Sequence, residues 1–100
     1  MPEQFTREKL PSGKVIIRQF DKKGVLVEES HSHGEDLDIC ISFEFQNGRK
    51  THETYFGKKR MVGRKTYEKA CLNYPDMPPA DSAIEDFGAS LIRGAAQERN

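Results

Sequence analysis

Tryptophan is absent from this sequence, cysteine is nearly so, and no apolar run is long enough to cross a membrane. The residues after Met1 form no apolar signal-peptide core. The two cysteines, Cys40 and Cys71, lie far apart and form no CxxC pair, which favours reduced thiols. These absences predict a cytoplasmic protein without a membrane contact.

An excess of charge of one sign is also lacking, because 16 Lys and Arg residues balance 16 Asp and Glu residues. A zero net charge argues against a strongly basic nucleic-acid binder. The zero is a sum of opposing blocks: residues 21–44 and 76–100 are acidic, and residues 57–69 are basic. The balance therefore says little about the local surface that a partner would meet.

Motifs of catalysis are missing as well. The sequence contains no GxSxG, P-loop, GxGxxG or HExxH pattern, and its glycines are spread over turns. Adjacent acids such as Glu28 and Glu29 point to opposite faces of a strand and make poor catalytic pairs. We therefore expect a binding module rather than an enzyme, with no cofactor.

The front of the chain, residues 14–63, predicts an antiparallel sheet of four to five strands. The clearest strand is 37–45, where Leu37, Ile39, Ile41, Phe43 and Phe45 alternate with polar residues. Hairpin turns are predicted where Gly24 ends residues 21–24 and where Asn47 precedes Gly48.

Beyond residue 63 the apolar spacing becomes helical. Tyr67, Ala70, Cys71 and Tyr74 share one face of a predicted helix over 64–74, which Pro75 ends. Residues 75–81 form a proline-rich connector, and a capping box at Ser82 predicts a second helix over 82–97. Its apolar residues are expected to cover the face with Ile39, Ile41 and Phe43. The sequence thus predicts one α+β domain over 1–100, with two C-terminal helices packed on the sheet.

Two hairpin segments echo each other, with an aromatic residue before the turn and a Gly-to-Glu spacing of five residues after it. The residues that carry the pattern are Phe20, Gly24, Leu26, Phe45, Gly48, Tyr55, Met61 and Gly63. Over residues 14–67 it resembles the degenerate MORN-type hairpin repeats of many bacterial proteins, which include a group of antitoxin-like repeat proteins. The sequence departs from the stricter MORN pattern in lacking its tryptophan and dense glycines. The resemblance implies a binding scaffold.

Two candidate sites remain open. His31 and His33 point to one side if extended, and with Cys40 and His52 they supply ligand types of zinc and related metals, or a thiol–imidazole pair. The second candidate is a basic segment that could bind an anion, a protein partner or, less favoured by the net charge, a nucleic acid. Self-association through a strand edge is a further possibility. The basic residues are Lys58, Lys59, Arg60, Arg64 and Lys65.

Overall fold

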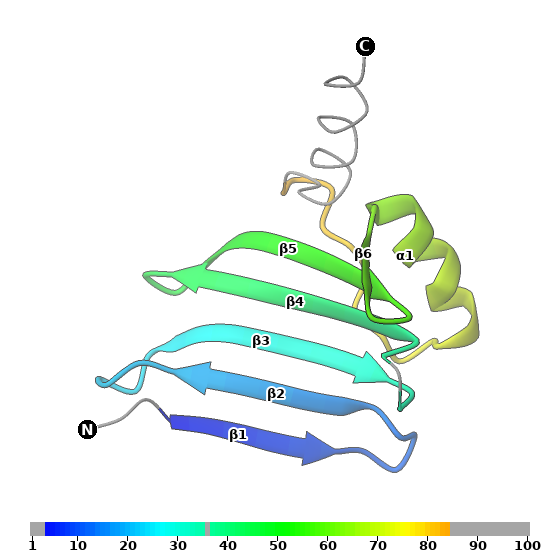
Figure 1. The fold of residues 1–100 in the computed structure, drawn as a ribbon. Helices are drawn as coiled ribbons and strands as arrows, with labels where there is room; N and C mark the ends of the chain where they lie inside the picture. The colour runs from blue at the N-terminus through cyan, green and yellow to red at the C-terminus, as the bar shows by residue number, and fades with distance from the viewer. Residues whose placement is uncertain (1–3, 36, 85–100) are drawn as a thin grey trace.

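Six antiparallel strands follow one another in sequence order in a computed structural model that describes residues 4–35 and 37–84. Each strand pairs with the one before it, so the sheet is an uninterrupted meander (Figure 1). The strands are β1 (Gln4–Lys9), β2 (Val15–Phe20), β3 (Leu26–His33), β4 (Ile39–Gln46), β5 (Arg49–Gly57) and β6 (Arg60–Val62). A short helix α1 (Arg64–Ala70) continues into a 3-10 turn η1 (Cys71–Asn73).

The hairpin turns lie where the sequence predicts them. Gly24 has a φ of 83°, and the Asn47-Gly48 turn has φ values of 53° and 78°. Positive φ at both central residues matches the right-handed twist of the flanking strands, which is why Asn-Gly favours such hairpins. The turn between β5 and β6 takes the same conformation with Lys58 and Lys59, residues that lack this preference.

The predicted strand count is wrong, because the sheet has six strands and begins at Gln4 rather than at residue 14. All six residues of β1 are exposed, and the strand carries few β-branched residues. Without a buried face there is no apolar alternation to mark it. Pairing with β2, from Gln4 opposite Phe20 to Lys9 opposite Val15, makes it a strand.

The prediction of two helices packed on the sheet is also wrong: the described residues contain one short helix and its 3-10 extension. No described helix is long and apolar enough to span a membrane. The predicted helix 82–97 falls mostly outside the described residues, and Ser82 and Ala83 form a turn. The helix over 64–74 exists in shorter form and ends before Pro75.

The core forms between the sheet and the segment that follows it. Ile39, Ile41 and Phe43 are covered by Tyr67 of α1 and by Met77 of the connector. Ala70, Cys71 and Tyr74 pack against the same cluster, as the helical spacing predicts. The cover that the sequence assigns to a second helix is therefore supplied by α1, by η1 and by the irregular segment 74–80.

Candidate functional site

The register of the sheet sorts its side chains onto two faces, because directly opposed residues share a face. Ile16, His31, Ile41, Tyr55 and Val62 oppose one another in turn across β2 to β6. They lie on the face packed against α1 and the segment after it, which we call the covered face. The opposite side, the open face, carries a second row of opposed residues: Arg7, Ile17, Ser30, Ser42 and Thr54.

On the covered face, a polar cluster ties the connector to the sheet. The ring of His33 stacks on Tyr74 with centroids 4.9 Å apart, and its Nε2 lies 2.7 Å from Oδ1 of Asp76. The hydroxyl of Ser12 donates to the same carboxylate, and Nζ of Lys14 donates to the Asp76 carbonyl at 2.7 Å. The Ser12 and His33 hydrogen bonds lower the pKa of Asp76 below its usual value. His33 is therefore engaged in holding the chain after α1.

A second polar cluster centres on Glu53, which is completely buried. Its Oε1 accepts hydrogen bonds from the Tyr55 hydroxyl at 2.8 Å and from the Asp81 backbone N–H at 2.9 Å. Its Oε2 lies 3.1 Å from Nζ of Lys50. Nε of Arg64 donates to the Tyr55 hydroxyl at 3.2 Å. These contacts join β5, the start of α1 and the connector, so the cluster has a structural role.

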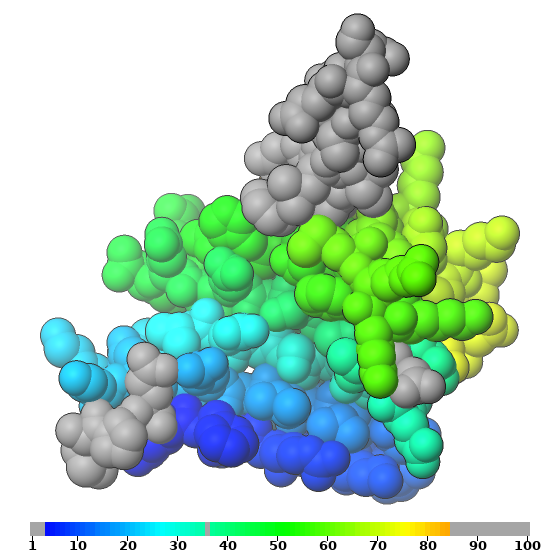
Figure 2. All heavy atoms as spheres, viewed as in Figure 1, coloured from blue at the N-terminus to red at the C-terminus, as the bar shows by residue number. Residues whose placement is uncertain are grey.

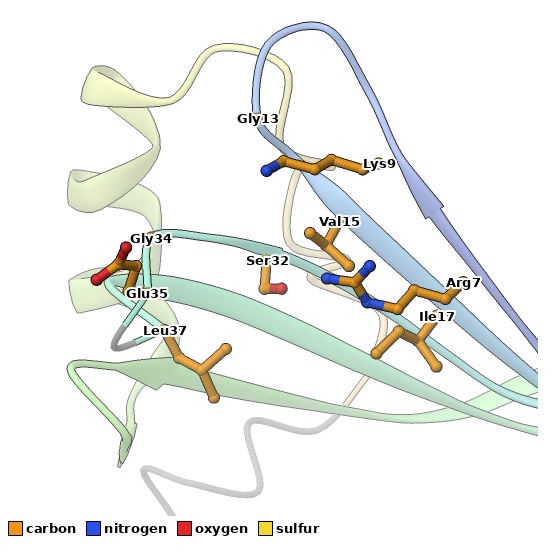
Figure 3. A pocket seen from close by; sticks show the side chains of 9 residues that line it. All are labelled: Arg7, Lys9, Gly13, Val15, Ile17, Ser32, Gly34, Glu35 and Leu37. Carbon is orange, nitrogen blue, oxygen red and sulfur yellow. The ribbon is translucent and has the colours of Figure 1, made fainter.

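The open face contains a pocket of about 430 Å³ where β1 and β3 end and β2 begins. Arg7 and Lys9 reach over β2 from β1, while Glu35 and Leu37 stand on the loop after β3 (Figure 3). The remaining lining residues are Gly13, Val15, Ile17, Ser32 and Gly34. Neither Arg7 nor Lys9 takes part in an ion pair within residues 4–35 and 37–84. The pocket thus combines two cationic groups with an apolar floor.

The predicted histidine–cysteine set is not brought together. His31 and His33 both lie on the covered face, while Cys40 opposes Ser32 on the open face. His52 also lies on the open face, but it opposes Glu44 and sits four residues before Phe56, the partner of Cys40. Within the part of the chain that the structure describes, no three His, Cys, Asp or Glu side chains are grouped to hold a metal.

Thiol chemistry has no support from the surroundings of the cysteines. Both are free. Burial raises the pKa of Cys40 to about 11 and raises the pKa of Cys71 as well. Because the thiolate is the reactive form, these cysteines behave as small core residues.

The predicted basic segment divides into parts with different roles. Lys58 and Lys59 form the exposed turn between β5 and β6, and Arg60 follows at the start of β6. Arg64 instead reaches the Tyr55 hydroxyl and the Ile84 carbonyl. Lys65 is exposed in the first turn of α1. Arg64 is therefore engaged within the fold, whereas Lys58, Lys59, Arg60 and Lys65 are exposed, and their binding of a partner stays a prediction.

His31 is the buried polar side chain that fits its surroundings least well. Its Nδ1 has no hydrogen-bond partner among the described residues, and its ring packs edge-on to Phe43. Burial, with the charge of Lys14 nearby, lowers the pKa of His31 below its usual value of 6.5. The folded protein therefore keeps this ring neutral at a pH where the unfolded chain protonates it.

The change His31→Leu is expected to stabilise the protein by about 1 kcal/mol at pH 7.5, because it removes a buried unsatisfied nitrogen. The gain should grow as pH falls below about 6.5, because the unfolded wild type then binds a proton that the folded ring does not. Urea denaturation of both proteins at pH 7.5 and 5.5 measures the difference, in which the other titrating groups cancel. A gain that stays constant with pH contradicts the assignment.

Comparison of the chain with protein-family models, with curated proteins and with solved structures found no match. The fold and the site define a six-stranded antiparallel meander with one face covered by a short helix and the segment that follows it, and with a cationic pocket on the other face.

Proposed function

We propose that the protein is a small binding module whose open face receives an acidic segment of a partner protein. The observation that carries this proposal is the pocket, where Arg7 and Lys9 overhang the aliphatic side chains of Val15 and Ile17. A carboxylate beside an aliphatic side chain complements both parts of this surface. Glu35 stands on the opposite wall of the pocket and repels a second carboxylate at that wall. It therefore restricts the orientation in which the acidic segment of the partner can bind.

Exposed apolar side chains also lie outside the pocket. Besides Ile17 and Leu37, which line it, Met61 is 39% exposed and Phe5 is 69% exposed. Between them lie the small hydroxyl side chains Ser30, Ser42 and Thr54, which allow a partner backbone to approach closely. Apolar side chains rimmed by polar groups are typical of protein-interaction surfaces.

Other features support a scaffold role in the reducing cytoplasm. Successive hairpins in one meander are the arrangement that the MORN-type resemblance implies, and the resemblance itself remains a prediction. The free cysteines suit a reducing compartment.

Selection from a random peptide library displayed on phage, with the full chain immobilised, tests the proposal. We expect enrichment of peptides that place Asp or Glu beside Ile, Leu or Val. The change Lys9→Glu should weaken the binding of an enriched peptide about tenfold, as expected for reversing one charge at the rim of a site. The matched control is Lys22→Glu, which makes the same charge change in the turn between β2 and β3.

Enrichment of peptides without an acidic residue, or no enrichment over the uncoated support, would overturn the proposal. So would an equal loss of binding in the Lys9 and Lys22 variants, which would show attraction to net charge alone. Short nucleic acids that compete for the same surface would also count against a protein partner.

A further inference from the structure

The strand β1 forms one edge of the sheet and has a neighbour on one side only among the described strands. It runs along one margin of the molecule, away from α1 (Figures 1 and 2). All of its six residues are exposed, whereas the opposite edge strand β6 has only three residues. An edge of this length presents a row of backbone groups that another strand can pair with.

The turn that follows β1 shows which backbone groups face outward. The N–H of Leu10 donates to the Lys14 carbonyl, and the N–H of Gly13 donates to the Leu10 carbonyl. Leu10 and Lys14 are therefore a hydrogen-bonded pair, and such pairs alternate along an antiparallel ladder. It follows that even-numbered residues of β1 direct their N–H and C=O groups toward β2. The odd-numbered residues direct their N–H and C=O groups outward, away from β2. These residues are Phe5, Arg7 and Lys9.

We propose that β1 pairs in antiparallel orientation with β1 of a second copy of this chain, around a two-fold axis at Thr6. Only outward, odd-numbered residues of the two copies can exchange hydrogen bonds. An axis at Arg7 places Arg7 opposite its own copy, and an axis at Glu8 places Arg7 opposite Lys9, so both registers oppose like charges. An axis at Thr6 places each Phe5 opposite Arg7 and gives two hydrogen-bonded pairs within residues 4–9. An axis at Phe5 gives only one such pair there.

This register also joins side chains that suit each other. Phe5 and Arg7 are on the open face, because Phe5 opposes Gln19 and Arg7 opposes Ile17. The guanidinium of one copy can therefore lie against the exposed aromatic ring of the other, a favourable cation–π contact. Because Arg7 also lines the pocket, the second copy contributes its Phe5 beside that pocket. The two sheets become one, with both open faces on the same side.

The oligomeric state of the purified full chain tests the pairing without any ligand, so its failure is separate from that of the proposed function. A weak edge contact dissociates over about 1–100 μM. Sedimentation equilibrium across that range should therefore show the average mass rising from the chain mass of 11.4 kDa toward twice that value. The change Phe5→Lys opposes two cations and should raise the dimer dissociation constant about tenfold, whereas Phe5→Glu should preserve or tighten the dimer. Arg60→Glu, on the opposite edge strand β6, is the control distant from this edge.

Cross-linking tests the register itself. Thr6→Cys places two thiols at a non-hydrogen-bonded pair on the two-fold axis, where the Cα atoms lie about 4.5 Å apart, close enough for a disulfide. Glu8→Cys places them several residues apart. We expect a disulfide-linked dimer of the first variant only, on a non-reducing gel. A chain that stays monomeric at about 100 μM would overturn the proposal. A dimer that Phe5→Glu disrupts would also overturn it, as would equal cross-linking of the Thr6→Cys and Glu8→Cys variants.

Discussion

The change Glu53→Ala is expected to lower the free energy of unfolding by about 3 kcal/mol, because it leaves the polar partners of a buried carboxylate without an acceptor. The Tyr55 hydroxyl and the Asp81 N–H each lose a hydrogen bond to Oε1. Nζ of Lys50, which also lies 4.0 Å from the centre of the Phe43 ring, loses its ion pair. The effect should therefore include loosening of the connector around Asp81.

Urea denaturation measures the loss, and hydrogen exchange at the Asp81 amide reports the loosening of the connector. Glu53→Gln is the conservative comparison, since an amide oxygen keeps one acceptor for the Tyr55 and Asp81 donors. We expect it to lose less than half as much. The matched control is Glu44→Ala on the neighbouring strand, where the carboxylate is exposed and the loss should stay below about 0.5 kcal/mol. Equal losses for Glu53 and Glu44 would contradict the structural role of Glu53.

The strands with a buried face could be predicted from the sequence. In β4, Ile39, Ile41 and Phe43 alternate with more polar residues, and the Asn47-Gly48 turn fixes where the chain reverses. The edge strand β1 could not be found in this way, because its residues bury neither face and it is defined by its pairing with β2. A strand of this kind is specified by tertiary contacts rather than by local pattern.

The cover of the sheet was harder to predict, because an irregular segment has no periodic signal. Met77 is buried against the sheet although it lies between prolines in a connector that the sequence marks only as irregular. The capping box at Ser82 drew the prediction toward a second helix. In the described part of the chain, the covering residues come from α1, from η1 and from residues 74–80.

The candidate site, like the fold, could be predicted from the sequence only in part. Alternation along β3 places His31 and His33 on one side, which is confirmed, but the sequence does not say that this side is the covered one. The partner of His33 is Asp76, which lies 43 residues away in the sequence. The pocket residues Arg7 and Lys9 belong to the strand that local pattern misses, so the pocket could not be predicted.

The change Tyr67→Ala is expected to cost 3–5 kcal/mol, about the range for removing a buried aromatic ring from a core. The ring is almost wholly buried and stacks on Tyr55 with centroids 5.1 Å apart. Its hydroxyl donates to the Pro78 carbonyl at 2.6 Å. Because α1 has only seven residues, too few for an isolated helix to be stable, we expect its helicity to be lost with this anchor.

Tyr67→Phe separates the ring from the hydroxyl: it should cost only about 1 kcal/mol, the usual value of one hydrogen bond. Leu72→Ala, in η1 at a side chain that is 82% exposed, is the matched control and should change the stability by less than about 0.5 kcal/mol. Chemical denaturation followed by far-UV circular dichroism measures both stability and helix content. If Tyr67→Ala and Leu72→Ala had equal effects, α1 would not be anchored to the sheet through Tyr67. The sheet would then need another cover for Ile39 and Ile41, since a sheet holds its apolar face only against a packed layer.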